Sequence, residues 1–121
     1  MINKNIILSF GLAVGALYAS GAHAHAKVDV AEPNANSELV QPPKEIRLQF
    51  SDTLEPAFTK IQLLDAKNVV IKLPKAVVDR ADPKIVSAQL PVLRSGQYLV
   101  RWSTMTRDSH KVKGEYRFKV K

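Results

Sequence analysis

The stretch QYLVRWSTMTRDSH, residues 97–110, decides the fold class of this 121-residue chain. Tyr98, Val100 and Trp102 alternate with residues of the opposite face, which is the period of a β-strand. The alternation predicts a strand over residues 97–103. The same stretch ends in an Asp-x-His triplet, so the predicted strand leads directly into residues that can bind a metal.

The rest of the chain shows the same two-residue period. The clearest further strands contain Ile46, Leu48 and Phe50, and then Tyr116, Phe118 and Val120 in a final strand that Gly114 is expected to open. Shorter segments of strand character cover residues 27–31, 59–64, 69–73, 76–78 and 84–90. Clusters of Pro, Gly, Asn and Asp separate these segments at the spacing of a β-sandwich, and no convincing helical period follows Ser20. We therefore expect an all-β domain with a loop over residues 104–113 at one end.

Residues 1–24 have the pattern of a secretory signal peptide. Lys4 gives a positive start, residues 6–18 form an apolar run, and Ala22-His23-Ala24 is an A-x-A cleavage pattern. Cleavage after Ala24 predicts a mature domain over residues 25–121 that begins with His25. The apolar run is shorter than the ~20 residues of a membrane-spanning helix, and no later run is as long. We expect no membrane span in the mature chain.

Two other cleavage positions stay open. Processing after Ser20-Gly21-Ala22 would expose His23, whereas processing after Ala24-His25-Ala26 would remove His25 altogether. The A-x-A pattern ending at Ala24 is the better signal.

Composition excludes several kinds of function. The chain has no cysteine, so thiolate metal sites and cysteine nucleophiles are absent and core burial must stabilise the fold. The formal charge of +7 would be compatible with nucleic-acid binding in a cytosolic protein. Export removes that opportunity, and we expect no nucleic-acid partner.

His25, Asp108 and His110 could together bind a metal. As a free N-terminus His25 offers its α-amine and its imidazole. In extended backbone Asp108 and His110 would point the same way, about 6.5 Å apart along the strand at ~3.3 Å per residue. Three nitrogens and one oxygen in a tetragonal arrangement suit Cu(II), and zinc, which prefers a tetrahedron, is the most plausible wrong metal. The alternative is a simple hydrogen-bonded Asp–His pair and an N-terminal histidine of no consequence.

These residues and several motifs around them resemble the CopC family of periplasmic copper-binding proteins along nearly the whole mature sequence. The shared features are the histidine at the cleavage junction, Pro33-Asn34-Ala35-Asn36, Ile46-Arg47-Leu48-Gln49-Phe50-Ser51 with a following acid, Gly96-Gln97-Tyr98-Leu99-Val100-Arg101-Trp102, and Asp108-Ser109-His110 before Gly114-Glu115-Tyr116-Arg117-Phe118. The resemblance implies an immunoglobulin-like Greek-key β-sandwich or barrel of seven to nine strands. It also implies one Cu(II) ion held by His25, Asp108 and His110, in a periplasmic protein of copper homeostasis or resistance that is not an enzyme.

The resemblance also raises two points where this sequence departs from the family. Asp52 stands where the family commonly has Glu, so it is either a ligand, a residue that orients a ligand, or only a turn former. Ser109 stands where relatives often have Gly, and it should matter little if its backbone angles are ordinary.

The resemblance carries expectations about copper chemistry and partners as well. The methionine-rich loop that binds Cu(I) in some members is missing, since the mature chain keeps only Met105, and we expect a Cu(II)-only protein. A CopD-type inner-membrane copper importer is the implied partner. The open alternatives are a small histidine-brace copper monooxygenase and a metal-free immunoglobulin-like binding module.

Overall fold

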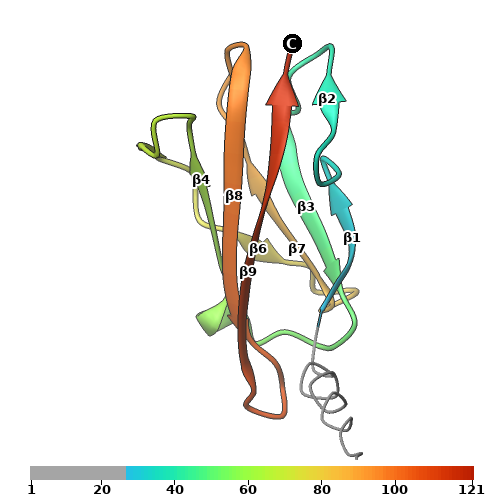
Figure 1. Cartoon of the computed structure of the whole chain (residues 1–121). Coiled ribbons are helices and arrows are strands. Elements are labelled where there is room, and N and C mark those ends of the chain that lie inside the picture. The colour runs from blue at the N-terminus through green and yellow to red at the C-terminus, as the bar shows by residue number, and fades with distance from the viewer. Residues whose placement is uncertain (1–26) are drawn as a thin grey trace, which may run out of the picture.

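The computed structural model describes residues 27–121, which form two β-sheets packed face to face (Figure 1). The strands are β1 (Val28–Glu32), β2 (Glu38–Leu39), β3 (Glu45–Phe50), β4 (Lys60–Leu64), β5 (Val70–Ile71), β6 (Val77–Val78), β7 (Ile85–Gln89), β8 (Gly96–Met105) and β9 (Lys111–Val120). One short 3-10 helix, η2 (Pro56–Phe58), precedes β4. The first sheet has the order β1-β3-β7-β6 and the second β2-β9-β8-β4-β5. The predicted all-β sandwich is confirmed.

The core lies between the two sheets, and the sequence alternation identifies its members. Ile46, Leu48 and Phe50 of β3 are at most 1% exposed. They meet the inward residues of the second sheet, among them Val100 and Phe118, in one cluster. Burial of such side chains contributes on the order of 1.5–3 kcal/mol each, so the alternating residues hold the two sheets together.

The longest element is the β8–β9 hairpin, whose ten-residue ladder runs from Gly96 paired with Val120 to Met105 paired with Lys111. This finding corrects two predictions. The strand predicted over residues 97–103 extends to Met105, and the final strand begins at Lys111 instead of Gly114. The predicted loop over residues 104–113 is therefore reduced to a tight turn.

Gly114 lies inside β9, where the Trp102 ring occupies the space that a side chain would need. A Cβ atom at Gly114 would come within 2.5 Å of the ring atom Cζ2 of Trp102, its cross-strand partner. The glycine is needed for this close packing and does not mark a strand end.

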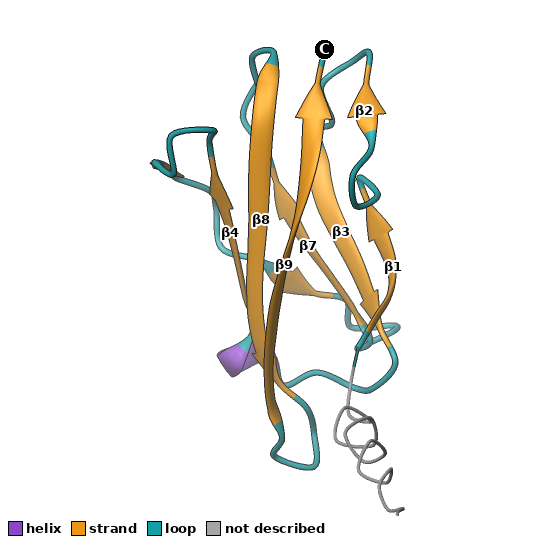
Figure 2. Cartoon of the chain, viewed as in Figure 1, coloured by secondary structure: helices purple, strands orange, loops and turns teal. Residues whose placement is uncertain are grey.

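The β8–β9 turn, the chain that follows β3 and the start of β1 all lie at one end of the sandwich, the lower end in Figure 1. Figure 2 shows the connecting loops at this end and η2 beside them. Within residues 27–121, no helix is long and apolar enough to cross a membrane. The predicted signal peptide, residues 1–24, and His25 lie outside the described residues.

Candidate metal centre

The β8–β9 turn positions the Asp-x-His triplet. The Thr106 amide donates to the carbonyl of His110 at 2.9 Å, and the Ser109 amide donates to the carbonyl of Thr106 at 2.8 Å. Ser109 has φ of +72°. This is a three-residue hairpin loop that closes through one residue in the left-handed region.

Asp108 and His110 converge within this turn. Asp108 Oδ2 lies 3.0 Å from His110 Nδ1, and both side chains remain accessible, at 62% and 47% exposure respectively. Both the metal-binding interpretation and the hydrogen-bonded pair require this proximity, but the extended backbone that was predicted to produce it is wrong. The two residues are brought together by the turn, because residues 107–109 are not extended strand.

Ser109 does not meet the condition under which its replacement of glycine would matter little, because its backbone angles are not ordinary. A φ of +72° lies in the region that glycine adopts freely and that costs other L-residues roughly 1–2 kcal/mol. A glycine at this position would avoid that cost.

Thr106 fixes the carboxylate of Asp108 from inside the turn. The Thr106 side chain is 1% exposed, and its hydroxyl donates a hydrogen bond to Asp108 Oδ1. This hydrogen bond, and then the one from His110, hold the pKa of Asp108 below its ordinary value. The carboxylate is therefore ionised at neutral and mildly acidic pH, the form that binds a metal.

Asp52 lies in the segment that packs against this turn. The Arg107 amide donates to the carbonyl of Thr53 at 3.0 Å. A surface hollow of about 370 Å³ is lined by Asp52, Thr53, Arg107 and Asp108. The predicted residue Asp52 is thus brought to the same hollow as Asp108, from a different part of the chain.

The first described residue is joined to the same segment. The Lys27 amide donates to Ser51 Oγ at 3.1 Å, and the Ser51 amide donates to the carbonyl of Lys27 at 2.9 Å. Ser51 directly precedes Asp52. The chain beginning at Lys27 is therefore anchored at the end of the sandwich that carries the β8–β9 turn.

The described residues alone do not make a complete metal site. Over residues 27–121, no group of three or more His, Cys, Asp and Glu side chains is close enough to hold an ion. The Asp108–His110 pair therefore needs at least one further ligand to bind a metal tightly.

Two residues of this centre were not anticipated from sequence, Thr106 and Arg107. Thr106 supplies the hydroxyl that orients Asp108, and Arg107 supplies the amide that ties the turn to Thr53. A threonine one residue before the turn, able to bond a carboxylate two residues later, was an available signal. The bond of Arg107 is made by its backbone amide, so the residue type at this position does not predict it.

Comparison with known proteins assigns the fold to a family. The family model for the CopC domain matches residues 28–121. Copper resistance protein C of Escherichia coli is 34% identical over 128 residues, covering 100% of this chain and 98% of that protein. The crystal structure of CopC from Methylosinus trichosporium OB3b superposes with a TM-score of 0.76 and 29% identity, covering 79% of this chain and 93% of that one. The crystal structure of PcoC, a methionine-rich copper resistance protein from Escherichia coli, superposes with a TM-score of 0.69 and 29% sequence identity. The match covers 81% of this chain and 100% of that one. The chain belongs to the CopC family.

Proposed function

We propose that this chain binds one Cu(II) ion in the periplasm, after removal of residues 1–24, and takes part in copper homeostasis or resistance. The observation that carries the proposal is the 3.0 Å contact of Asp108 Oδ2 with His110 Nδ1 in a turn fastened to the Asp52 segment. A copper-related role agrees with family membership and with the names of the relatives. Membership of this family argues against a metal-free binding module.

The contact distance is compatible with two neighbouring ligands of one ion. Metal–nitrogen and metal–oxygen bonds of about 2.0 Å at a right angle place the two ligand atoms about 2.8 Å apart, close to the observed 3.0 Å. Alternatively Asp108 keeps its contact with Nδ1 and orients the ring, as carboxylates do beside metal-bound histidines. Both arrangements make His110 a ligand.

His25 would supply the ligands that the described residues lack. It lies two residues before Lys27, and two residues of extended chain span at most about 7 Å. Because Lys27 is hydrogen-bonded to Ser51, next to Asp52, a mature N-terminus at His25 would begin close to the Asp52 segment. We propose His25 as a chelating residue through its amine and imidazole, with Asp52 as a ligand or an orienting acceptor.

The proposed oxidation state follows from ligand chemistry. Imidazole, amine and carboxylate groups suit Cu(II), whereas Cu(I) selects thioether and thiolate sulfur. The chain has no cysteine and two methionines, of which only Met105 falls in residues 25–121. This composition differs from that of the methionine-rich PcoC. We infer a Cu(II)-only site.

We propose a carrier or sequestering protein and not an enzyme. As a metal ligand, the Asp108 carboxylate would fill a coordination position that a copper monooxygenase needs for oxygen. Copper would be handed over by ligand exchange, and a CopD-type inner-membrane importer is the proposed recipient.

The test uses the exported protein, whose N-terminus is first determined by mass analysis. Cu(II) is then titrated in competition with a chromophoric chelator. We expect an N-terminus at His25, one ion per chain, and much weaker binding when one alanine is added before His25. An N-terminus beyond residue 25, or an unchanged affinity with the added alanine, would remove the amine from the site.

A further inference from the structure

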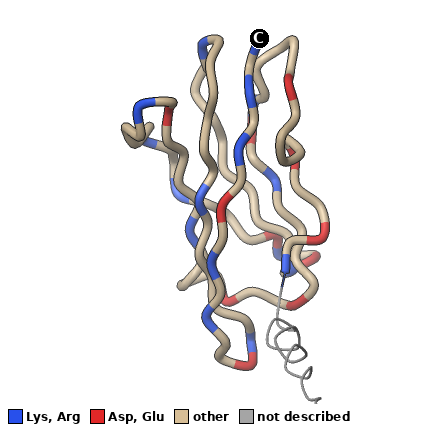
Figure 3. The backbone as a smooth tube through the Cα atoms, in the orientation of Figure 1, with Lys and Arg blue, Asp and Glu red and all other residues tan. Residues whose placement is uncertain are grey.

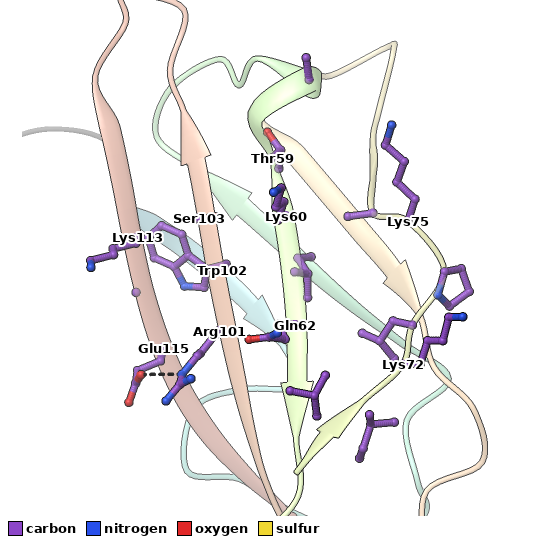
Figure 4. A pocket seen from close by; sticks show the side chains of 18 residues that line it. Thr59, Lys60, Gln62, Lys72, Lys75, Arg101, Trp102, Ser103, Lys113 and Glu115 are labelled. Atoms are coloured by element: carbon purple, nitrogen blue, oxygen red, sulfur yellow. Dashed lines mark hydrogen bonds and ion pairs between the residues drawn. The ribbon is translucent and has the colours of Figure 1, made fainter. Parts of the chain in front are cut away.

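A groove of about 1020 Å³ is separate from the hollow of the metal centre (Figure 4). Its walls are β4, the neighbouring parts of β8 and β9, and the segment 70–76, which consists of β5 and the chain that leads from it to β6. We call it the basic groove. It belongs to neither the Asp108–His110 turn nor the Asp52 hollow.

The basic groove carries an excess of positive charge. Five cationic side chains line it, namely Lys60, Lys72, Lys75, Lys113 and Arg101, against the one acid Glu115. Arg101 Nε lies 3.3 Å from Glu115 Oε1, so this pair neutralises itself. Within residues 27–121, no carboxylate forms an ion pair with any of the four lysines. Figure 3 shows Lys and Arg positions recurring along β9, whereas β8 carries Arg101 alone.

Apolar side chains line the same groove. Ile61, Ile71, Leu73 and Trp102 contribute to its wall and are each only partly covered by the core against which they pack. Trp102 lies edge-on to the core ring of Phe50, so Trp102 and its cross-strand partner Ile61 face the first sheet. Lys60, Arg101 and Lys113 face the opposite way, because successive strand residues point to opposite faces. The surface that is open to a partner is therefore mainly cationic and complementary to an acidic chain. A free Cu(II) ion would be repelled by four unpaired lysines, so the groove is not a second copper site.

One end of the basic groove approaches the metal centre. Ser103 pairs with Lys113 on the β8–β9 ladder, and both line the groove. Lys113 follows His110 by three residues, which corresponds to about 10 Å along a strand. A chain bound in the groove would therefore have one end close to His110.

We propose that the basic groove docks an extended acidic segment of a protein partner that exchanges copper with this chain. The role in copper exchange rests on the proposed function, whereas the docking itself does not. Lysines around the groove would steer the acidic segment and make the association salt-dependent.

The docking is tested without copper, using the processed protein labelled with ¹⁵N and a synthetic peptide in which Glu alternates with Leu. We expect amide shift changes on β4, the segment 70–76 and the adjoining parts of β8 and β9. Binding should weaken about tenfold when monovalent salt rises from low to physiological concentration. The same peptide with Lys in place of Glu should not bind.

Charge reversal tests whether the basic groove is responsible. The double variant Lys60→Glu with Lys72→Glu should weaken peptide binding tenfold or more, and Lys44→Glu with Lys84→Glu, an equal change outside the groove, should leave it unchanged. Equal weakening in both variants, or shift changes mapping elsewhere, would overturn the proposal. Tighter binding to vesicles containing phosphatidylglycerol than to the peptide, lost in the groove variant, would overturn it in favour of a lipid surface. Since Cu(II) affinity should be the same in all variants, this outcome is independent of the proposed copper site.

Discussion

The β4–β5 turn and the β8–β9 turn have the same pattern of backbone hydrogen bonds but differ in the contacts of their side chains. In the turn between β4 and β5 the Asp65 amide donates to the carbonyl of Val69 at 2.9 Å, and the Asn68 amide donates to the carbonyl of Asp65 at 2.9 Å. Asn68 has φ of +64°. The β8–β9 turn has the same two hydrogen bonds at corresponding positions, and its residue Ser109 has φ of +72°.

The position of the carboxylate separates the two turns. Asp65 opens its turn, and its Oδ1 accepts the amides of Lys67 at 2.8 Å and Val69 at 3.0 Å. Asp108 occupies the third position of its turn and contacts the His110 ring instead. The first carboxylate stabilises its own backbone, whereas the second is directed at a potential metal ligand. The same type of turn is therefore stabilised by its carboxylate in β4–β5, whereas in β8–β9 it holds a carboxylate beside a histidine.

The largest effect is expected when the closing residue of one turn is copied into the other. His110→Val gives the β8–β9 turn the residue that closes the β4–β5 turn. Because the imidazole is a proposed ligand, Cu(II) affinity should fall roughly 100-fold or more, at or above the upper end of losses for residues that only orient ligands. Competition with a chromophoric chelator measures it.

The fold should survive this substitution, since Val69 closes the same turn elsewhere. The metal-free melting temperature should stay close to that of the unaltered protein. At the same excess of Cu(II), the stabilisation should be smaller by about 2.7 kcal/mol, which corresponds to a roughly 100-fold loss of affinity. A variant that gains as much stability from Cu(II) as the unaltered protein would show that His110 is not a ligand.

A second comparison removes each of the two carboxylates in turn. Asp65→Ala removes the two hydrogen bonds that Asp65 Oδ1 accepts from the amides of Lys67 and Val69. It should cost about 1 kcal/mol of the free energy of unfolding, as loss of a capping side chain does, with Cu(II) affinity unchanged. Asp108→Asn should do the reverse, weakening Cu(II) binding roughly 10–100-fold with little change in stability. Urea unfolding and copper competition on both variants measure the two effects. If Asp108→Asn changed stability and left affinity intact, the two carboxylates would have the same structural role.

The sequence predicts the strands well and the turns less well, for a physical reason. A strand reveals itself by alternation, which Ile46, Leu48 and Phe50 show and which their burial confirms. A turn of this kind depends on one residue with positive φ, and in the β8–β9 turn that residue is Ser109, a type that gives no such signal. The pairing of Asp108 with His110 was therefore predicted for the wrong reason.

Gly114 and the basic groove show the same limit at longer range. The glycine was expected to end a loop, but its role is set by the Trp102 ring across the ladder. The groove joins lysines of the two strands β4 and β9 with lysines of the segment 70–76, and the proximity of these lysines depends on strand order. Local pattern carries no information about strand order, so neither feature could be predicted from residue type and spacing.

A smaller effect is expected at Thr106, which opens its turn at the position that Asp65 occupies in the β4–β5 turn. Thr106→Val keeps the shape of a buried side chain but removes the hydroxyl that holds Asp108 Oδ1. Cu(II) affinity should fall about tenfold, the lower end of losses for residues that orient ligands. Thr106→Ser should restore most of it, because serine retains the hydroxyl.

Spectroscopy separates orientation from general destabilisation at Thr106. The electron paramagnetic resonance parameters of bound Cu(II) should change in Thr106→Val and return to their original values in Thr106→Ser. Both variants losing affinity equally, with unaltered spectra, would show that the hydroxyl does not position the ligand.

The smallest effect concerns the left-handed residue that the two turns share. Ser109→Gly should raise the free energy of unfolding of the metal-free protein by about 0.5–1 kcal/mol, since relief of the roughly 1–2 kcal/mol conformational cost is offset in part by the greater freedom of glycine in the unfolded chain. Asn68→Gly is the matched control and should change less, because asparagine tolerates positive φ better than serine. Urea unfolding of both variants measures the difference. Equal gains in the two would mean that Ser109 is no more strained than Asn68, and a loss of stability in Ser109→Gly would mean that the serine side chain itself stabilises the turn.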